Sequence, residues 1–293
     1  MSFTDFVTQA WDEHAAQPAA VAERLASKGL ALVADEADVA ALAQLVHHVL
    51  GEHLGRWNDG LAALAALAAK PACMASTSAA QVVQRCQASL GLCAGQGDTR
   101  PQLAASDAIR VTALAAAALA EHETPRAIQL LRDALARSDA AHLAADDPAH
   151  RALAVAGHNL ACTLEEKSAR SGVEVELMVL AAQTSRRFWA LAGGWLEIER
   201  AEYRLAMSWL QAGKPALAHI HAQRCLDIVQ RETAPALEHF FAWEALAVVA
   251  RAADSADADH AVAQAHEAFT RLDDADRSGC QASLDKLGPV AAR

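Results

Sequence analysis

The amino-acid sequence predicts an all-helical chain, and three observations support this prediction. Most of its 53% hydrophobic content is Ala and Leu, which favour helices, whereas the chain has only 1 Tyr and 6 Phe. No stretch of four to eight residues shows the alternation of polar and apolar residues that is typical of a strand. A Leu-Ala pair recurs along the chain at similar intervals, which indicates repeated helix hairpins.

The clearest hairpin lies between Trp195 and Gln230. On its first helix, residues recur at steps of three and four and therefore share one face; they are Trp195, Ile198, Glu202, Leu205, Ala206 and Trp209. Gly213 ends that helix and Pro215 begins the second helix. The inner stripe of the second helix comprises Leu217, Ala218, Ala222, Cys225, Leu226 and Val229. The small residues on both stripes let the two helices approach closely.

The Leu-Ala pair of this hairpin has three counterparts. The four pairs begin at Leu114, Leu160, Leu205 and Leu246, which are 46, 45 and 41 residues apart by subtraction. Small residues mark the second helix after the first and last of these pairs, in the sets Ala127, Leu131, Ala134 and Ala261, Ala265, Ala268. The helix from Val173 to Leu191 lacks such a set.

The order of large and small residues resembles the tetratricopeptide repeat (TPR). Leu205-Ala206, Trp209 and Gly213 match the family's first helix and turn, and Ala218, Ala222 and Cys225 match its second helix. Glu202 stands where the family has its first aromatic residue. The resemblance implies a right-handed superhelical array of antiparallel helix hairpins, a TPR-like α-solenoid. Its units are longer than the standard repeat of about 34 residues.

The N-terminal region is less regular. Its expected helices cover residues 3–14, 18–28, 35–53, 61–69 and 78–92, and Gly29 is expected to close the second of them. The turn from Gly55 to Gly60 resembles one degenerate repeat. The strongest loop, residues 95–101, separates an irregular helical region, 1–100, from the repeat array, 101–293. A final helix over 276–287 is expected to cap the array, because an open end would expose core.

Charge and composition exclude several classes of protein. The net charge of −11 and the absence of a basic run longer than Arg186-Arg187 disfavour nucleic-acid binding. The N-terminus lacks the pattern of a secretory signal, and no apolar run approaches the about 20 residues that span a membrane. We therefore expect a soluble cytoplasmic protein. None of the 6 Cys residues forms a C-x-x-C pair, which predicts buried reduced thiols.

Catalytic and metal-binding motifs are weak. In the segment HHVLGEH, His48 and Glu52 are one helical turn apart and could share a metal, but no third ligand is evident and no H-E-x-x-H motif is present. No G-x-S-x-G, P-loop or G-x-G-x-x-G motif occurs. The sequence therefore predicts no catalytic residue, no metal ligand and no cofactor. A metal-dependent enzyme that uses the segment from His47 to His53 is kept as a distant alternative.

The first helices of TPR proteins line a groove that binds peptides, and the resemblance implies the same here. The corresponding positions for binding a peptide or partner are Asn159, Arg200, Tyr203, Arg204, Met207, Phe241, Glu244 and Arg251. Arg200 and Arg204 are one turn apart and could bind one carboxylate. With Asn159 they resemble part of the family's carboxylate clamp. Alternatively, both arginines pair on their own helix with Glu197, Glu199 or Glu202.

These patterns predict a non-catalytic scaffold or adaptor that binds a peptide or a partner helix in its groove, in part through an acidic group of the partner. The alternative is a peptide- or effector-sensing module of the kind found in bacterial regulators, acting with a separate output protein. We do not expect the protein to bind nucleic acid or a membrane. The sequence leaves open whether the protein is a monomer or forms a homodimer through its N-terminal helices.

Overall fold

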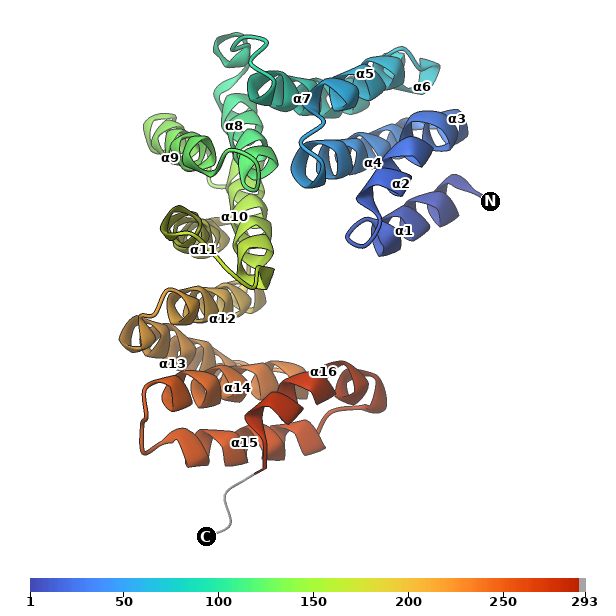
Figure 1. Cartoon of the computed structure of the whole chain (residues 1–293). Helices are drawn as coiled ribbons and strands as arrows, with labels where there is room; N and C mark the ends of the chain where they lie inside the picture. Colours follow the sequence, from blue (N-terminus) through green and yellow to red (C-terminus); the bar gives the residue numbers. More distant parts are fainter. Residues whose placement is uncertain (290–293) are drawn as a thin grey trace. The chain divides into compact units, whose positions relative to one another are not determined.

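The computed structural model describes residues 1–289, and this part of the chain is helical without a strand (Figure 1). The all-helical prediction is therefore confirmed. The chain divides into two compact units, Met1–Ala152 and Leu153–Arg293. From the sequence we expected a boundary at residue 100, between an irregular helical region and a repeat array. That boundary stays a prediction. Within the described residues, no helix combines the length and the apolar composition that crossing a membrane requires.

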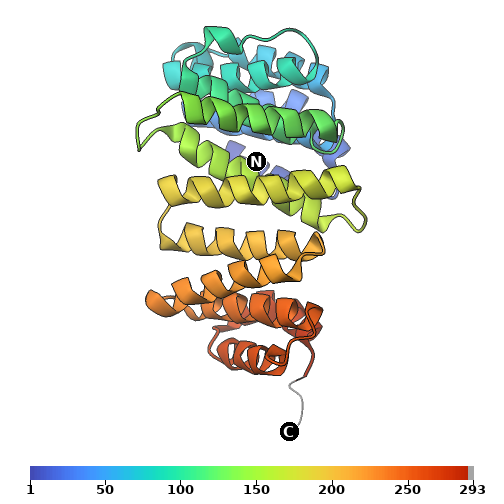
Figure 2. The ribbon, with the colours of Figure 1, turned by 90° about the vertical axis from the view of Figure 1, so that its left-hand side faces the viewer.

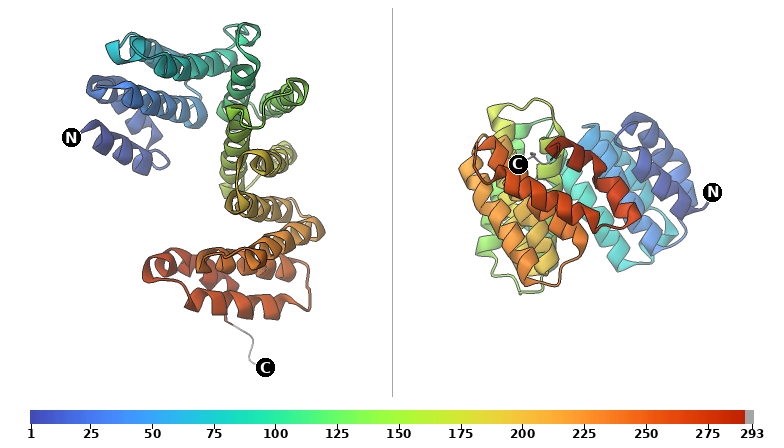
Figure 3. Two further views of the ribbon diagram at one scale, coloured as in Figure 1. Left: turned by 180° about the vertical axis from the view of Figure 1, so that it is seen from behind. Right: turned by 90° about the horizontal axis from the view of Figure 1, so that it is seen from below.

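The described part of the first unit contains nine complete α-helices. They are coloured from blue to green in Figure 3. They are α1 (Phe3–Glu13), α2 (Pro18–Arg24), α3 (Leu30–Leu32), α4 (Glu36–Val46), α5 (Trp57–Ala68), α6 (Pro71–Met74), α7 (Thr77–Cys93), α8 (Ala105–Leu119) and α9 (Thr124–Ala140). Two π-helical segments, η1 (Leu25–Gly29) and η2 (His47–His53), continue α2 and α4, and η3 (Arg100–Gln102) is a short 3-10 helix. Helix α7 packs on α4, α5 and α8, and α4 also packs on α5.

Gly29 does not close a helix as the sequence predicted. The chain continues through it from η1 into α3, with ordinary helical dihedral angles at Gly29. A Cβ atom at this position would lie 2.8 Å from Cε1 of the buried Phe6. Glycine is therefore required here by the close approach of α1, and not by a turn.

The second unit begins within α10 (Pro148–Glu166) and continues through six further helices, the last of them the expected C-terminal helix. They are α11 (Gly172–Ala192), α12 (Trp195–Gln211), α13 (Pro215–Arg231), α14 (Ala236–Ala252), α15 (Ala258–Thr270) and α16 (Asp274–Leu287). From α11 to α15 each helix packs on the next, as the rows from yellow to red in Figure 2 show. Helix α12 also contacts α14, and α16 covers α14 and α15.

The small residues of the predicted hairpin lie in the core. Ala206, Ala218, Ala222 and Cys225 are fully buried in one cluster that joins α12 to α15. Gly213 ends α12 with a φ angle of 69°, as the turn requires. Leu217 is wrongly assigned to the inner stripe, because 39% of it is exposed and Ala218 takes the inner position.

The cysteines are free thiols, and five of the six are buried, while Cys162 is partly buried. Burial raises the pKa of Cys86 and of Cys93 to about 12. The prediction of reduced thiols in the helix packing is consistent with these positions.

Candidate functional site

Four of the predicted binding residues form one connected group where α12 faces α14. The Tyr203 hydroxyl donates a hydrogen bond to Glu244 Oε2 at 3.0 Å. The ring of Phe241 meets that of Tyr203 edge to face, with centroids 5.8 Å apart. Met207 is partly buried and packs against the core cluster of α12 to α15. These side chains therefore brace two helices, and their exposed surface is small.

Arg200 is the most exposed of the predicted arginines on α12. Its Nη2 lies 2.5 Å from Oε1 of Glu238 on α14, and its Nε lies 3.4 Å from Oε2. The Arg200 side chain is 56% exposed, whereas that of Glu238 is 5% exposed. A buried carboxylate thus holds a guanidinium group at the surface.

Arg204 is more deeply placed. Its side chain is 23% exposed and forms an ion pair with Glu165 of α10, which is 6% exposed. Ser208 Oγ donates a second hydrogen bond to Glu165, at 2.5 Å. Burial raises the pKa of Glu165, although Arg204 and Ser208 oppose this effect. The Arg204 guanidinium group is therefore engaged within the protein.

The ion pairs of Arg200 and Arg204 cross to neighbouring helices, whereas the alternative from sequence expected partners on α12. Glu238 is 38 residues from Arg200, and Glu165 is 39 residues from Arg204. The pairs therefore link α12 to α14 and to α10.

The two remaining predicted residues are Asn159 and Arg251. Asn159 is exposed on α10. Arg251, near the end of α14, donates a hydrogen bond to the Leu287 carbonyl oxygen of α16. The structure thus brings together Tyr203, Phe241 and Glu244 most closely, and it places Arg251 beside the C-terminal helix.

Sequence reasoning missed a row of buried carboxylates on α12. Glu199 and Glu202 are each 1% exposed. Glu202 accepts from Arg186 Nε of α11 at 2.5 Å and contacts His221 Nδ1 of α13 at 2.6 Å. Its position on the apolar stripe, in place of the aromatic residue of the repeat, was the signal in the sequence. A charged residue on such a stripe indicates a buried ion pair.

Glu199 is placed between a thiol and a second carboxylate. Cys225 Sγ donates to Glu199 Oε1 at 2.8 Å. Burial raises the pKa of Glu199 to about 7, the neighbouring Glu238 adds to the shift, and the Cys225 thiol opposes it. The Glu199 carboxyl group therefore retains its proton well above pH 4.5.

Because the pKa of Glu199 is raised, we expect the stability of the folded protein to depend on pH. Between pH 4.5 and 7 the folded state binds more protons at Glu199 than the unfolded state, so the free energy of unfolding falls as pH rises through this range. Glu199→Gln should remove this contribution. We expect its melting temperature, relative to the wild type, to rise from pH 5 to pH 8. The exposed Glu267→Gln is the control, and a constant difference between wild type and Glu199→Gln would contradict the assignment.

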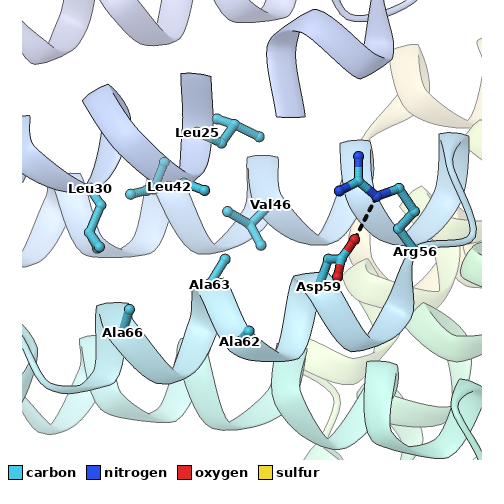
Figure 4. A pocket seen from close by; sticks show the side chains of 10 residues that line it. Leu25, Leu30, Leu42, Val46, Arg56, Asp59, Ala62, Ala63 and Ala66 are labelled. Atoms are coloured by element: carbon cyan, nitrogen blue, oxygen red, sulfur yellow. Dashed lines mark hydrogen bonds and ion pairs between the residues drawn. The ribbon is translucent and has the colours of Figure 1, made fainter. Parts of the chain in front are cut away.

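The first unit contains a cleft of about 370 Å³, shown in Figure 4. Its apolar lining comprises Leu25, Ala26, Leu30, Leu42, Val46, Ala62, Ala63 and Ala66. Arg56 and Asp59 stand at one end, and Arg56 Nε lies 2.6 Å from Asp59 Oδ2. This size and lining suit a small apolar group with one polar contact.

Comparison of the chain with protein-family models, with curated proteins and with solved structures found no match.

Proposed function

We propose that the chain is a TPR-like helical repeat protein that binds a peptide or helix of a partner protein without catalysing a reaction. The sequential packing of α11 to α15 and the contact of α12 with α14 support the repeat architecture. The right-handed array, the groove and the cytoplasmic location belong to this proposal.

The observation that carries the proposal is the exposed guanidinium group of Arg200. A guanidinium group has five N–H donors, and the contact with Glu238 uses only the nitrogens Nε and Nη2. With 56% of the side chain exposed, Arg200 can bind a further carboxylate while Glu238 fixes its orientation. An acidic side chain or C-terminus of a partner has the chemistry that fits.

In this proposal, contacts between helices hold the surface around Arg200 in place before a partner binds. Tyr203 joins α12 to α14 through Glu244, and Arg204 joins α12 to α10 through Glu165. Because these contacts already fix the helices, the partner alone loses conformational freedom on binding. The predicted residues Tyr203 and Arg204 thus act in this proposal mainly by supporting the position of Arg200.

Arg200→Gln is expected to weaken binding of the native partner at least tenfold, because it removes the charge that faces the carboxylate. The partner is identified by affinity capture from the native cell, and its dissociation constant is then measured with purified proteins. Arg231→Gln is the matched control, because Arg231 is 69% exposed on α13 and pairs with the adjacent Glu232.

Circular dichroism should show equal helix content for both variants. A partner that binds Arg200→Gln and the wild type equally would contradict the role of Arg200. Double charge reversal at Arg200 and Arg204 is a poor test, because it would place a new carboxylate beside the buried Glu165.

The cleft of the first unit supports a second candidate function, a peptide- or effector-sensing module with a separate output protein. Ala63→Trp would fill the cleft beside Ala62 and Ala66. If a small ligand copurifies with the wild type and is absent from this variant, sensing is favoured over scaffolding. Mass spectrometry of the extracted proteins makes the comparison.

A further inference from the structure

Three histidines of the first unit converge on one point. His14 directly follows α1, and His48 and His53 belong to η2. One potential ligand atom from each lies within 4.8 Å of the others. The closest pair, His48 Nε2 and His53 Nε2, is 3.1 Å apart. All three side chains are partly exposed, so an ion from solvent can reach them.

The π-helical geometry of η2 explains why His48 and His53 meet. Residues five apart in an α-helix are separated by about 140° around the axis at 3.6 residues per turn. In a π-helix the hydrogen bonds run between residues five apart, as in the bond from Leu54 N to Val49 O at 3.2 Å. The wider turn brings both imidazole rings to one side, with centroids 4.6 Å apart.

Neighbouring acceptors fix the tautomers of two of these rings. His48 Nδ1 lies 2.7 Å from Glu52 Oε2, and a carboxylate requires an N–H donor. His14 Nδ1 lies against the Trp11 carbonyl oxygen, which likewise only accepts. Each ring therefore donates through Nδ1 and keeps the lone pair of Nε2 for a ligand bond.

A second contact holds Glu52 itself in place. Glu52 Oε1 lies 3.3 Å from Nδ1 of the buried His47, whose Nε2 lies 2.9 Å from Ser89 Oγ on α7. A carboxylate that orients a histidine in this way is the usual support of a metal-binding imidazole. The sequence predicted no metal ligand, although it placed His48 and Glu52 one helical turn apart, where they could share a metal. The structure makes Glu52 the support of His48.

We propose that His14, His48 and His53 bind one Zn²⁺ ion, with the fourth position left to water. Three neutral imidazoles without a thiolate suit Zn²⁺ among the available divalent ions. Zn–N bonds of about 2.0–2.1 Å place two nitrogens of a tetrahedral site about 3.3 Å apart, close to the spacing of His48 and His53. His14 completes the site by a small movement toward them.

The bound ion would join α1 to η2, because His14 and the other two ligands come from different segments. The site is thus a clamp on the N-terminal helix. It uses residues of the first unit, and its existence is independent of partner binding through Arg200 in the second unit.

Titration of the full-length protein with Zn²⁺ against a chromophoric chelator tests the proposal. We expect one equivalent to bind the wild type, and Glu52→Gln to lower the affinity roughly 10–100-fold. His14→Gln should lower it more, because it removes a ligand. The exposed His219→Gln on α13 is the control and should bind as the wild type does.

Amide exchange of α1 provides a second measurement. Zn²⁺ should slow exchange in Phe3–Glu13 of the wild type and leave that of His14→Gln unchanged. Circular dichroism without metal should show that the variant is folded. Equal Zn²⁺ affinity of wild type and His14→Gln, or binding of Ni²⁺ or Cu²⁺ but not Zn²⁺ by the wild type, would overturn the proposal.

Discussion

Glu202→Ala is expected to lower the free energy of unfolding of the second unit by about 3–5 kcal/mol. The wild-type carboxylate is buried and accepts from Arg186 of α11 and His221 of α13, so one side chain on α12 joins three helices. Burial alone would raise the pKa of Glu202, but hydrogen bonds with His221 and Arg186 keep it below its ordinary value. Its removal leaves both partners without this acceptor and opens a cavity.

Urea denaturation followed by circular dichroism measures this loss. Glu267→Ala is the matched control, because Glu267 and Arg271 form a surface pair with side chains 53% and 61% exposed. Such a pair contributes about 0–1 kcal/mol. Similar urea midpoints for the two variants would contradict the central role of Glu202.

Gly157→Ala is expected to destabilise the second unit by about 2–3 kcal/mol through overpacking. A Cβ atom at Gly157 on α10 would lie 2.5 Å from the carbonyl oxygen of Ala181 and 2.8 Å from the backbone nitrogen of Ser185, both on α11. Backbone atoms cannot move aside as a flexible side chain can. The two helices would therefore have to separate.

Gly91→Ala provides the same change in an open position. Gly91 lies within α7, and a Cβ atom there meets nothing within 4 Å. We expect this variant to gain roughly 0.5–1 kcal/mol, because alanine favours the helix. Thermal unfolding of both variants decides the matter: a melting temperature of Gly157→Ala at or above the wild-type value would exclude close helix contact at this glycine.

The helix hairpins could be predicted from the sequence because their evidence is local. Ala206, Ala218 and Ala222 are small residues at helical spacing, and all three are fully buried. The π-helical segments could not be predicted in this way. The course of the chain through Gly29 depends on Phe6, which comes from another helix. Periodicity within one helix carries no information about such a neighbour.

The candidate sites were harder to predict, for the same reason. Arg200 was recognised from its position on the first helix, but its partner Glu238 lies on α14. Likewise, the segment HHVLGEH drew attention to His48 and Glu52, whereas the cluster in the structure joins His48 and His53 to His14, which comes from the end of α1. A spacing rule finds ligands on one helix, and only the fold reveals a ligand from another.

The buried thiols can be used to detect opening of the core around them. An alkylating reagent attacks the thiolate, which is scarce at neutral pH for Cys86 and Cys93 because their pKa values are about 12. Cys225 is likewise sealed in the core of the second unit. Each thiol can therefore be labelled only when its surroundings open, so labelling rates would time the opening of the two units separately.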